Sequence, residues 1–106
     1  MIEKPNLNYL KEISGGDVVF EQKMIEIVKK ELPEEIKSYE IFLNEHNFIQ
    51  AAEIVHKIKH KISILGLEKS YQTAIDFEED LKRQELTLQL EFEQILNSMV
   101  NFVKDL

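Results

Sequence analysis

One short stretch of the chain concentrates side chains that could do chemistry. Residues 51–67 read AAEIVHKIKHKISILGL, with two histidines and three lysines in the six positions from 56 to 61. On an α-helix, four side chains spaced i, i+3, i+4 and i+7 share one face: His56, Lys59, His60 and Ser63. A neutral imidazole on such a face can attack phosphorus while an ammonium group one turn away stabilises the phosphoryl oxygens. The spacing therefore suggests phosphoryl chemistry.

The apolar residues of the same stretch predict which way this face points. Six of them cluster within roughly a quarter-turn of the helix and define its buried side: Ala51, Ile54, Val55, Ile58, Ile62 and Leu65. His56 lies about 140° from the centre of that stripe, on the same side as Ile49 and Ala52. The histidines are therefore expected on an exposed cationic face that has small and apolar neighbours.

Three other interpretations of this cluster remain possible. Lysines on an exposed helix are most often solubilising charge, with the histidines incidental. Histidines at i and i+4 can chelate zinc, but the HExxH pattern lacks its Glu after His56, the lysines repel a dication, and a third ligand such as Glu53 would be needed, so no metal site is predicted. Contact with anionic lipid or nucleic acid is disfavoured because the cluster is short and has no neighbouring aromatic residue.

Composition limits the classes of protein to which the chain can belong. It has 106 residues, a net charge of −7 and no cysteine. The absence of cysteine excludes a disulfide framework, a thiolate nucleophile and a cysteine-ligated zinc site. The acidic charge disfavours general nucleic-acid binding. No signal peptide or membrane-length apolar run is visible, so we expect a cytoplasmic protein with no nucleic-acid or membrane partner.

The first half of the chain predicts a short helix followed by a long one. The short helix has Asn6 as a possible cap, and residues 14–16, Ser-Gly-Gly, should end it. Asp17 should cap the second helix, which ends at about His46. Pro33 lies inside this helix, and we expect the helix to kink or restart there.

Three further helices complete the predicted fold. The one that carries the cationic cluster should begin near Asn47 or Phe48 and end at Leu65, with Gly66 in the left-handed conformation. The next has one apolar face made of Leu67, Tyr71, Ala74, Phe77 and Leu81. The last has apolar residues spaced four and three apart: Leu88, Phe92, Ile95, Met99, Phe102 and Leu106. We predict an all-α single domain over residues 1–106, an antiparallel four-helix bundle with a short additional N-terminal helix at one end.

The segment HKIKHKISILGL resembles the HxxK…G signature of histidine-containing phosphotransfer (HPt) domains. His56 corresponds to the phosphoacceptor, Ile58 to the apolar residue two positions on, Lys59 to the lysine that stabilises the phosphoryl group, and Gly66 to the structural glycine that closes the helix. SGGD, ELPEEI and FEEDLK also stand where HPt sequences carry similar segments.

The resemblance implies a phosphocarrier that relays a phosphoryl group between aspartates of response-regulator receiver domains, with a hybrid histidine kinase upstream. Such a protein needs no cofactor of its own, because the receiver supplies Mg²⁺. The chain has no Gly-rich phosphate loop and no room for an ATP-binding domain, so no kinase activity is expected. A bundle that buries its own apolar stripes has no need of a partner subunit, so we expect a monomer.

The expected partner-binding residues are those around the histidine: Ile49, Ala52, Lys57, His60 and Ser63. His60 departs from the family pattern, which usually has Gly or another small residue at i+4, and its ring should reach back toward His56 and restrict which receivers dock. His46 should be structural or idle. The alternative is an inactive HPt relative, a helical interaction module that binds a partner without accepting phosphate.

Overall fold

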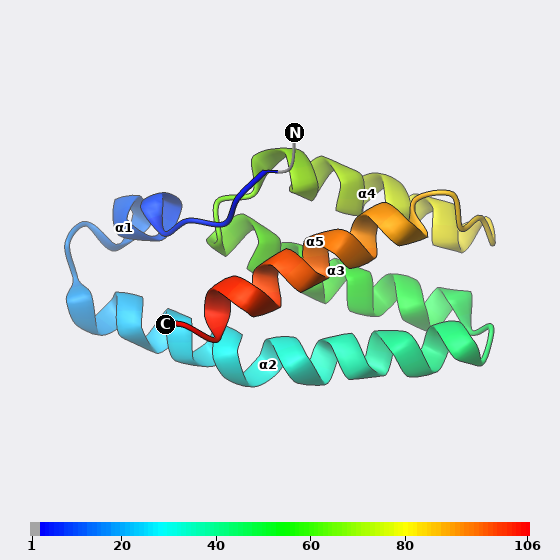
Figure 1. Cartoon of the computed structure of the whole chain (residues 1–106), viewed down its shortest axis with the longest axis horizontal. Coiled ribbons are helices and arrows are strands. Elements are labelled where there is room, and N and C mark those ends of the chain that lie inside the picture. Colours follow the sequence, from blue (N-terminus) through cyan, green and yellow to red (C-terminus); the bar gives the residue numbers. More distant parts are fainter. Residues whose placement is uncertain (1–2) are drawn as a thin grey trace.

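The computed structural model describes residues 3–106, and this part of the chain is helical with no β-strand. Met1 and Ile2, the start of the stretch in which no signal peptide is expected, lie outside the described residues. The helices are α1 (Asn8–Ser14), α2 (Val18–Asn44), α3 (Phe48–Ile64), α4 (Glu68–Lys82) and α5 (Gln89–Val103). Figure 1 shows α2 to α5 side by side and α1 at one end. The predicted four-helix bundle with a short N-terminal helix is confirmed.

The predicted start of α2 and both predicted ends of α3 are formed by the residues expected there, whereas α1 begins after Leu7 and not after Asn6. The Asp17 carboxylate accepts a hydrogen bond from the Phe20 N–H at 3.1 Å and begins α2. The Asn47 side chain accepts one from the Gln50 N–H at 3.3 Å and begins α3. Gly66 follows α3 with φ of 73°, a conformation that glycine adopts at little cost. These local signals fix the length of the helix that carries the candidate site.

Pro33 does not divide α2. The helix runs unbroken through it, so the predicted restart is wrong. Proline removes one backbone N–H and thus one helical hydrogen bond. Val28 and Leu32 before it and Tyr39 after it are all buried on one stripe of α2, and their packing stabilises the helix on both sides of the proline.

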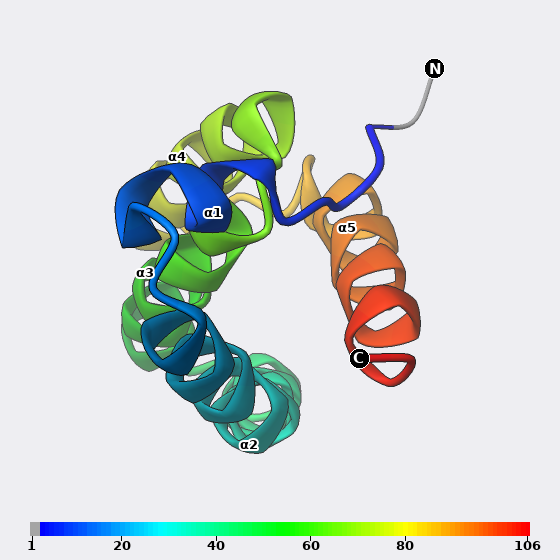
Figure 2. The same ribbon diagram turned by 90° about the vertical axis from the view of Figure 1, so that its left-hand side faces the viewer.

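The four long helices form a closed ring. α3 packs against α2 and α4, and α5 packs against α4 and α2. Figure 2, which turns the view of Figure 1 by 90°, shows α5 on the side of the bundle opposite α3. α1 contacts α2 and α3 at the end of the bundle where α3 turns into α4. None of the described helices combines the length and apolar character needed to cross a membrane.

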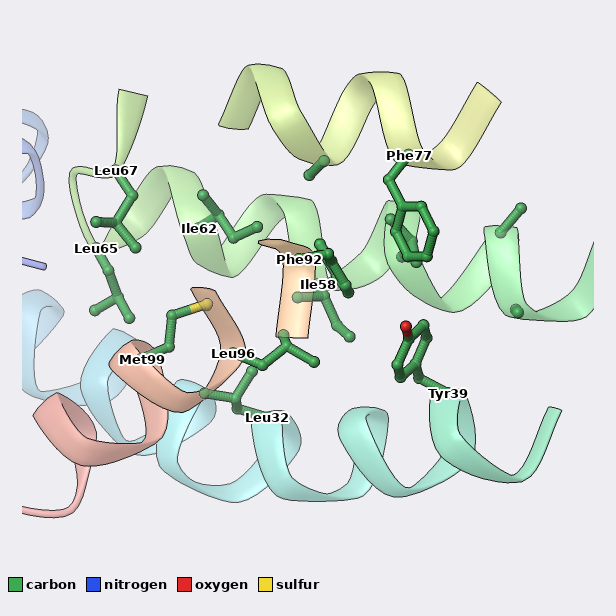
Figure 3. Close-up of a cluster of buried hydrophobic side chains, with 14 of the residues drawn as sticks. Leu32, Tyr39, Ile58, Ile62, Leu65, Leu67, Phe77, Phe92, Leu96 and Met99 are labelled. Atoms are coloured by element: carbon green, nitrogen blue, oxygen red, sulfur yellow. The ribbon is translucent and has the colours of Figure 1, made fainter. Parts of the chain in front are cut away.

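The core contains an aromatic cluster from three helices (Figure 3). The Tyr39 ring lies edge-on to Phe77 and Phe92, at centroid distances of 6.3 and 5.5 Å. The Tyr39 hydroxyl donates to the Glu93 carboxylate at 3.0 Å, and burial, together with the charge of Glu93, raises the pKa of Tyr39.

The buried face of α5 is rotated from the predicted one. Leu96 and Val103 are buried beside Phe92 and Met99. Ile95 and Phe102 are only partly buried, and Leu106 lies beyond the helix and is exposed. The buried face differs from the predicted one because α5 contacts both α2 and α4. The residues of α5 that face the groove between those two helices are the ones that become buried.

Candidate functional site

His56 lies in the middle of α3 and points out of the bundle. Its side chain is 52% exposed, whereas its neighbours Val55 and Ile58 are fully buried. The exposed position predicted for this histidine is therefore confirmed. A rigid helix with one face in the core holds the imidazole in a defined place while leaving the ring accessible to a partner.

A carboxylate from the next helix contacts this imidazole. Both oxygens of Glu78, on α4, lie 3.3 Å from His56 Nδ1. Glu78 Oε1 also accepts a hydrogen bond from Lys59 Nζ at 3.0 Å. The three side chains form a connected group, which we call the His56 triad, across the seam between α3 and α4. Lys82, one turn further along α4, lies 3.8 Å from the same carboxylate.

The charge of Glu78 is maintained by its neighbours. Burial raises the pKa of this carboxyl, but the hydrogen bond and charge of Lys59, followed by those of His56, outweigh burial and leave the pKa below its usual value. Glu78 is therefore ionised at neutral pH. An ionised carboxylate can only accept hydrogen bonds, so the neutral His56 ring donates from Nδ1 and keeps its lone pair on Nε2. The arrangement leaves Nε2 as the nucleophilic nitrogen.

Lys59 is less exposed than the sequence suggested. Its side chain is only 12% exposed, because α4 packs against this side of α3. The ammonium lies between the Glu78 carboxylate and the Tyr71 ring, 5.8 Å from the ring centroid. Lys59 is thus a cation held in one position beside His56, and not part of a solvated charged face.

Two other expectations about α3 are wrong for the same kind of reason. Ala52, expected beside His56 on the exposed face, is 1% exposed and belongs to the core, whereas Ile54, placed on the buried stripe, is only partly buried. Both departures follow from the side on which α4 and α2 approach α3, which the periodicity of α3 alone does not specify.

Lys61, the third lysine of the cluster, is buried and forms ion pairs with two carboxylates of α2. Its ammonium lies 2.7 Å from Glu31 and 2.9 Å from Glu35, both on α2. Burial lowers the pKa of Lys61, but the hydrogen bonds that it donates to the two carboxylates, together with their charges, outweigh burial and raise the pKa. Of the three lysines between positions 56 and 61, only Lys57 remains exposed.

The remaining predicted partner-binding residues divide between two hollows. The first, about 470 Å³, lies beside His56 and includes Ile49, Ala52, Lys57 and Lys82 in its lining. Ser63 lines a second hollow, two helical turns from His56, with Tyr9 and Tyr71. Ile49 and Lys57 are exposed as expected, and Ser63 is half-buried.

His60 contacts His56 as predicted. The two ring centroids lie 5.2 Å apart with an interplanar angle of 72°. The second ring therefore occupies space directly beside the first, where a small residue would leave the surface open. His46 lies far from this face, in the turn after α2, with its ring 5.7 Å from that of Phe48. Among residues 3–106, no group of three or more His, Asp or Glu side chains could hold a metal ion.

No role was predicted for Glu78, the residue that joins the triad. A signal was present: Glu78 follows Phe77 directly, three residues before Leu81 and four after Ala74, so it borders the apolar stripe of α4. A carboxylate beside such a stripe is seldom buried unless a cation or a hydrogen-bond donor faces it. Lys59 and His56 are those partners.

Comparison with known proteins agrees with this geometry. No curated protein and no solved structure matches the chain. The family model described as Hpt domain matches residues 23–105, which include the His56 triad and Gly66 but not α1. With most of its length matched, an exposed histidine on the third helix and a lysine one turn on, the chain belongs to the Hpt domain family, whose members carry phosphoryl groups in two-component signalling.

Proposed function

We propose that this chain is a phosphocarrier that accepts a phosphoryl group on His56 from the aspartyl-phosphate of one receiver domain and passes it to the aspartate of another. The observation that carries the proposal is the His56 triad, in which a buried carboxylate orients an exposed imidazole and a cation stands beside it. This arrangement on a family member has the parts that phosphoryl transfer requires: a positioned nucleophile and a compensating charge.

The chemistry follows from the positions of the protons. The lone pair on His56 Nε2 attacks phosphorus, the bond between phosphorus and the aspartate oxygen breaks, and the aspartate leaves as a carboxylate. The ring becomes positively charged because Nδ1 keeps its proton, and the Glu78 carboxylate beside Nδ1 stabilises that charge. Lys59 is placed to neutralise the phosphoryl oxygens as they approach. Transfer to the second receiver reverses these steps with a new aspartate as the nucleophile.

The receiver completes the site. Mg²⁺, which stabilises the charge on the transferring phosphoryl group, is expected from the acidic pocket of the receiver and not from this chain. Lys57 and Lys82 line the hollow beside His56 together with Glu53 and Glu78, and we expect the two lysines to pair with carboxylates of the acidic pocket. We propose receiver domains and a hybrid histidine kinase as partners, no kinase activity of the chain itself, a monomeric state and a cytoplasmic location.

The proposal is tested by phosphorylating a panel of receiver domains from the same organism and incubating each with the wild-type chain and with His56→Gln. The wild-type chain should acquire an acid-labile, base-stable label that the variant lacks. His60→Gln and His46→Asn are matched controls, and both should keep the label. Asn suits position 46 because the backbone there has φ of 58°, which Asn tolerates. Label that persists in His56→Gln would contradict the assignment.

The interaction-module alternative predicts a different result in the same experiment. An inactive relative would bind a receiver through Ile49 and the cations around His56, yet no label would transfer from any receiver. Binding without transfer by the wild-type chain would therefore favour that alternative.

A further inference from the structure

The segment that precedes α1 is hydrogen-bonded to the start of α4, one of the two helices that form the site. We call residues 3–7 the strap. The Glu3 carboxylate accepts hydrogen bonds from the backbone N–H groups of Lys69 and Ser70, at 3.0 and 2.9 Å, in the first turn of α4. Figure 1 shows the strap passing from α1 to the start of α4. Burial raises the pKa of Glu3, but the two N–H groups outweigh it and lower the pKa.

The strap also contacts the turn that ends α3. The Asn6 N–H donates to the Leu65 carbonyl at 2.8 Å. The Asn6 side chain lies so close to Gly66 that a Cβ on that glycine would stand 2.7 Å from Asn6 Oδ1. The same oxygen accepts from the Asn8 N–H at 3.0 Å, at the start of α1. These contacts fix the position of α1 relative to the end of α3.

The consequence is a hollow of about 220 Å³ between α1, α3 and α4. Tyr9 of α1 and Tyr71 of α4 contribute to its lining, together with Ser63 and Gly66. Tyr9 is 42% exposed, so its ring is available to a partner. Tyr71 also stands beside the Lys59 ammonium, 5.8 Å from its ring centroid, so this residue borders both the hollow and the His56 triad.

The hollow lies within the reach of an interface of ordinary size around His56. Ser63 lies seven residues from His56 on α3, or about 10 Å along the helix axis. A specific interface covers about 800 Å² on each partner, a patch of roughly 16 Å radius. An interface of this size centred on His56 would therefore include Ser63, which lines the same hollow as Tyr9.

We propose that the hollow between Tyr9 and Tyr71 receives an apolar side chain of the receiver that docks over His56, and that Glu3 holds α1 in place for this contact. The inference rests on the proposed function. The strap and α1 lie outside residues 23–105, the part matched by the family model, so this contact would be a feature of this chain's own N-terminal segment. Tyr9 would then contribute to the choice of receiver.

The test compares variants of Tyr9 with a matched exposed apolar residue elsewhere. Receiver domains of the same organism are phosphorylated with acetyl phosphate, and the receiver that transfers fastest to the wild-type chain is used throughout. Tyr9→Ala should lower kcat/KM for transfer about tenfold, as loss of an aromatic contact within an interface does. Tyr9→Phe should keep the wild-type rate. Leu90→Ala, on α5 and thus across the bundle from α3, should have no effect.

Glu3→Gln provides a second, independent variant. It should reduce hydrogen-exchange protection of the Ser70 amide and lower kcat/KM about threefold, since a neutral amide is a weaker acceptor for the α4 N–H groups. Phosphoramidate, a small donor that needs no docking surface, should label His56 equally in the wild-type chain, Tyr9→Ala and Glu3→Gln. Equal labelling shows that the variants are folded and that the chemistry at His56 is intact.

The possible failures are distinguishable. Wild-type rates of transfer from the receiver to Tyr9→Ala would overturn the docking inference and leave the proposed function standing. Equal losses for Tyr9→Ala and Leu90→Ala would do the same. Labelling of the wild-type chain by phosphoramidate with no transfer from any receiver would contradict the proposed function, and this inference with it. No label on His56 from either donor would overturn the proposed function, and this inference with it.

Discussion

Replacing Glu78 by Gln should both weaken the fold and slow phosphoryl transfer. The carboxylate is paired at 3.0 Å with Lys59, and both side chains are only 12% exposed. Hydrogen bonds to charged groups contribute about 1.5–3 kcal/mol to stability, and Gln keeps a neutral acceptor, so we expect a loss of about 1.5 kcal/mol. In a domain of this size that corresponds to a melting temperature about 8 °C lower.

The effect on stability should depend on pH in a defined direction. The pKa of Glu78 in the folded chain lies below its usual value of 4.5. The carboxylate therefore contributes its full stabilisation above that value and loses it as the pH falls through the lowered pKa. The difference in unfolding free energy between the wild-type chain and Glu78→Gln should be constant near neutral pH and disappear in acid.

The effect on transfer arises from the position of the imidazole proton. Glu78 accepts only, so it holds the proton of the neutral ring on Nδ1, whereas the Gln amide can either donate or accept and allows both tautomers. Loss of this preference, about 1 kcal/mol for a contact of 3.3 Å to a half-exposed ring, should slow transfer about fivefold. Rapid-quench measurement gives the rate, and two-bond ¹⁵N correlation spectra identify which ring nitrogen of His56 carries the proton.

Glu79→Gln is the matched control, with the same change of charge at the next residue of α4. The Glu79 side chain is 57% exposed, and among the described residues its one ion pair is with Lys82, so its replacement should change neither melting temperature nor rate. Equal effects of the two variants, or a wild-type ring protonated on Nε2, would refute the role given to Glu78.

Three further predictions concern residues around the site. Lys61→Met should destabilise the chain by about 2 kcal/mol in urea unfolding at neutral pH, because it leaves two carboxylates unpaired. Since the pKa of Lys61 is raised above its usual value of 10.5, the difference in unfolding free energy between the wild-type chain and the variant should shrink only as the pH rises above 10.5. Gly66→Ala should cost about 2 kcal/mol by the same measurement, because φ is positive and the new Cβ meets Asn6, and Asn6→Ala should recover part of that loss. His60→Gly should still be labelled at His56 but accept phosphate from more members of the receiver panel, because the ring beside His56 is gone; an unchanged range of receivers would leave His60 without a role in specificity.

Much of the fold could be predicted because its signals are local. Asp17, Asn47 and Gly66 act on backbone within a few residues of themselves, and a helix boundary needs nothing more distant. The exposure of His56 also followed from periodicity, because it lies nearly opposite the buried stripe of its own helix. The resemblance of its surroundings to the family signature then indicated its chemistry.

The parts that could not be predicted depend on contacts between helices. Ala52 lies on the predicted exposed face of α3 and Lys61 beside its predicted buried stripe, and the direction from which α4 and α2 approach decides that both side chains are covered. The pairing of Glu78 with Lys59 depends on the register between α3 and α4, which neither helix encodes alone. The tendency of Pro33 to end the helix was overestimated, because packing on both sides of it outweighs one missing hydrogen bond.

The cap that Glu3 places on α4 also bears on the order in which the chain folds. Asp17 and Asn47 accept from residues three positions away, so those helices can begin as soon as their first turns form. The first turn of α4 has no local side-chain cap and instead uses a carboxylate 66 residues away in sequence. Closing so long a loop is entropically costly before the bundle has formed, so the strap is expected to dock late. Interactions that form after the folding transition state slow unfolding more than they speed folding. Glu3 would therefore act mainly on the lifetime of the folded state, and α1 and the first turn of α4 would open together as one unit.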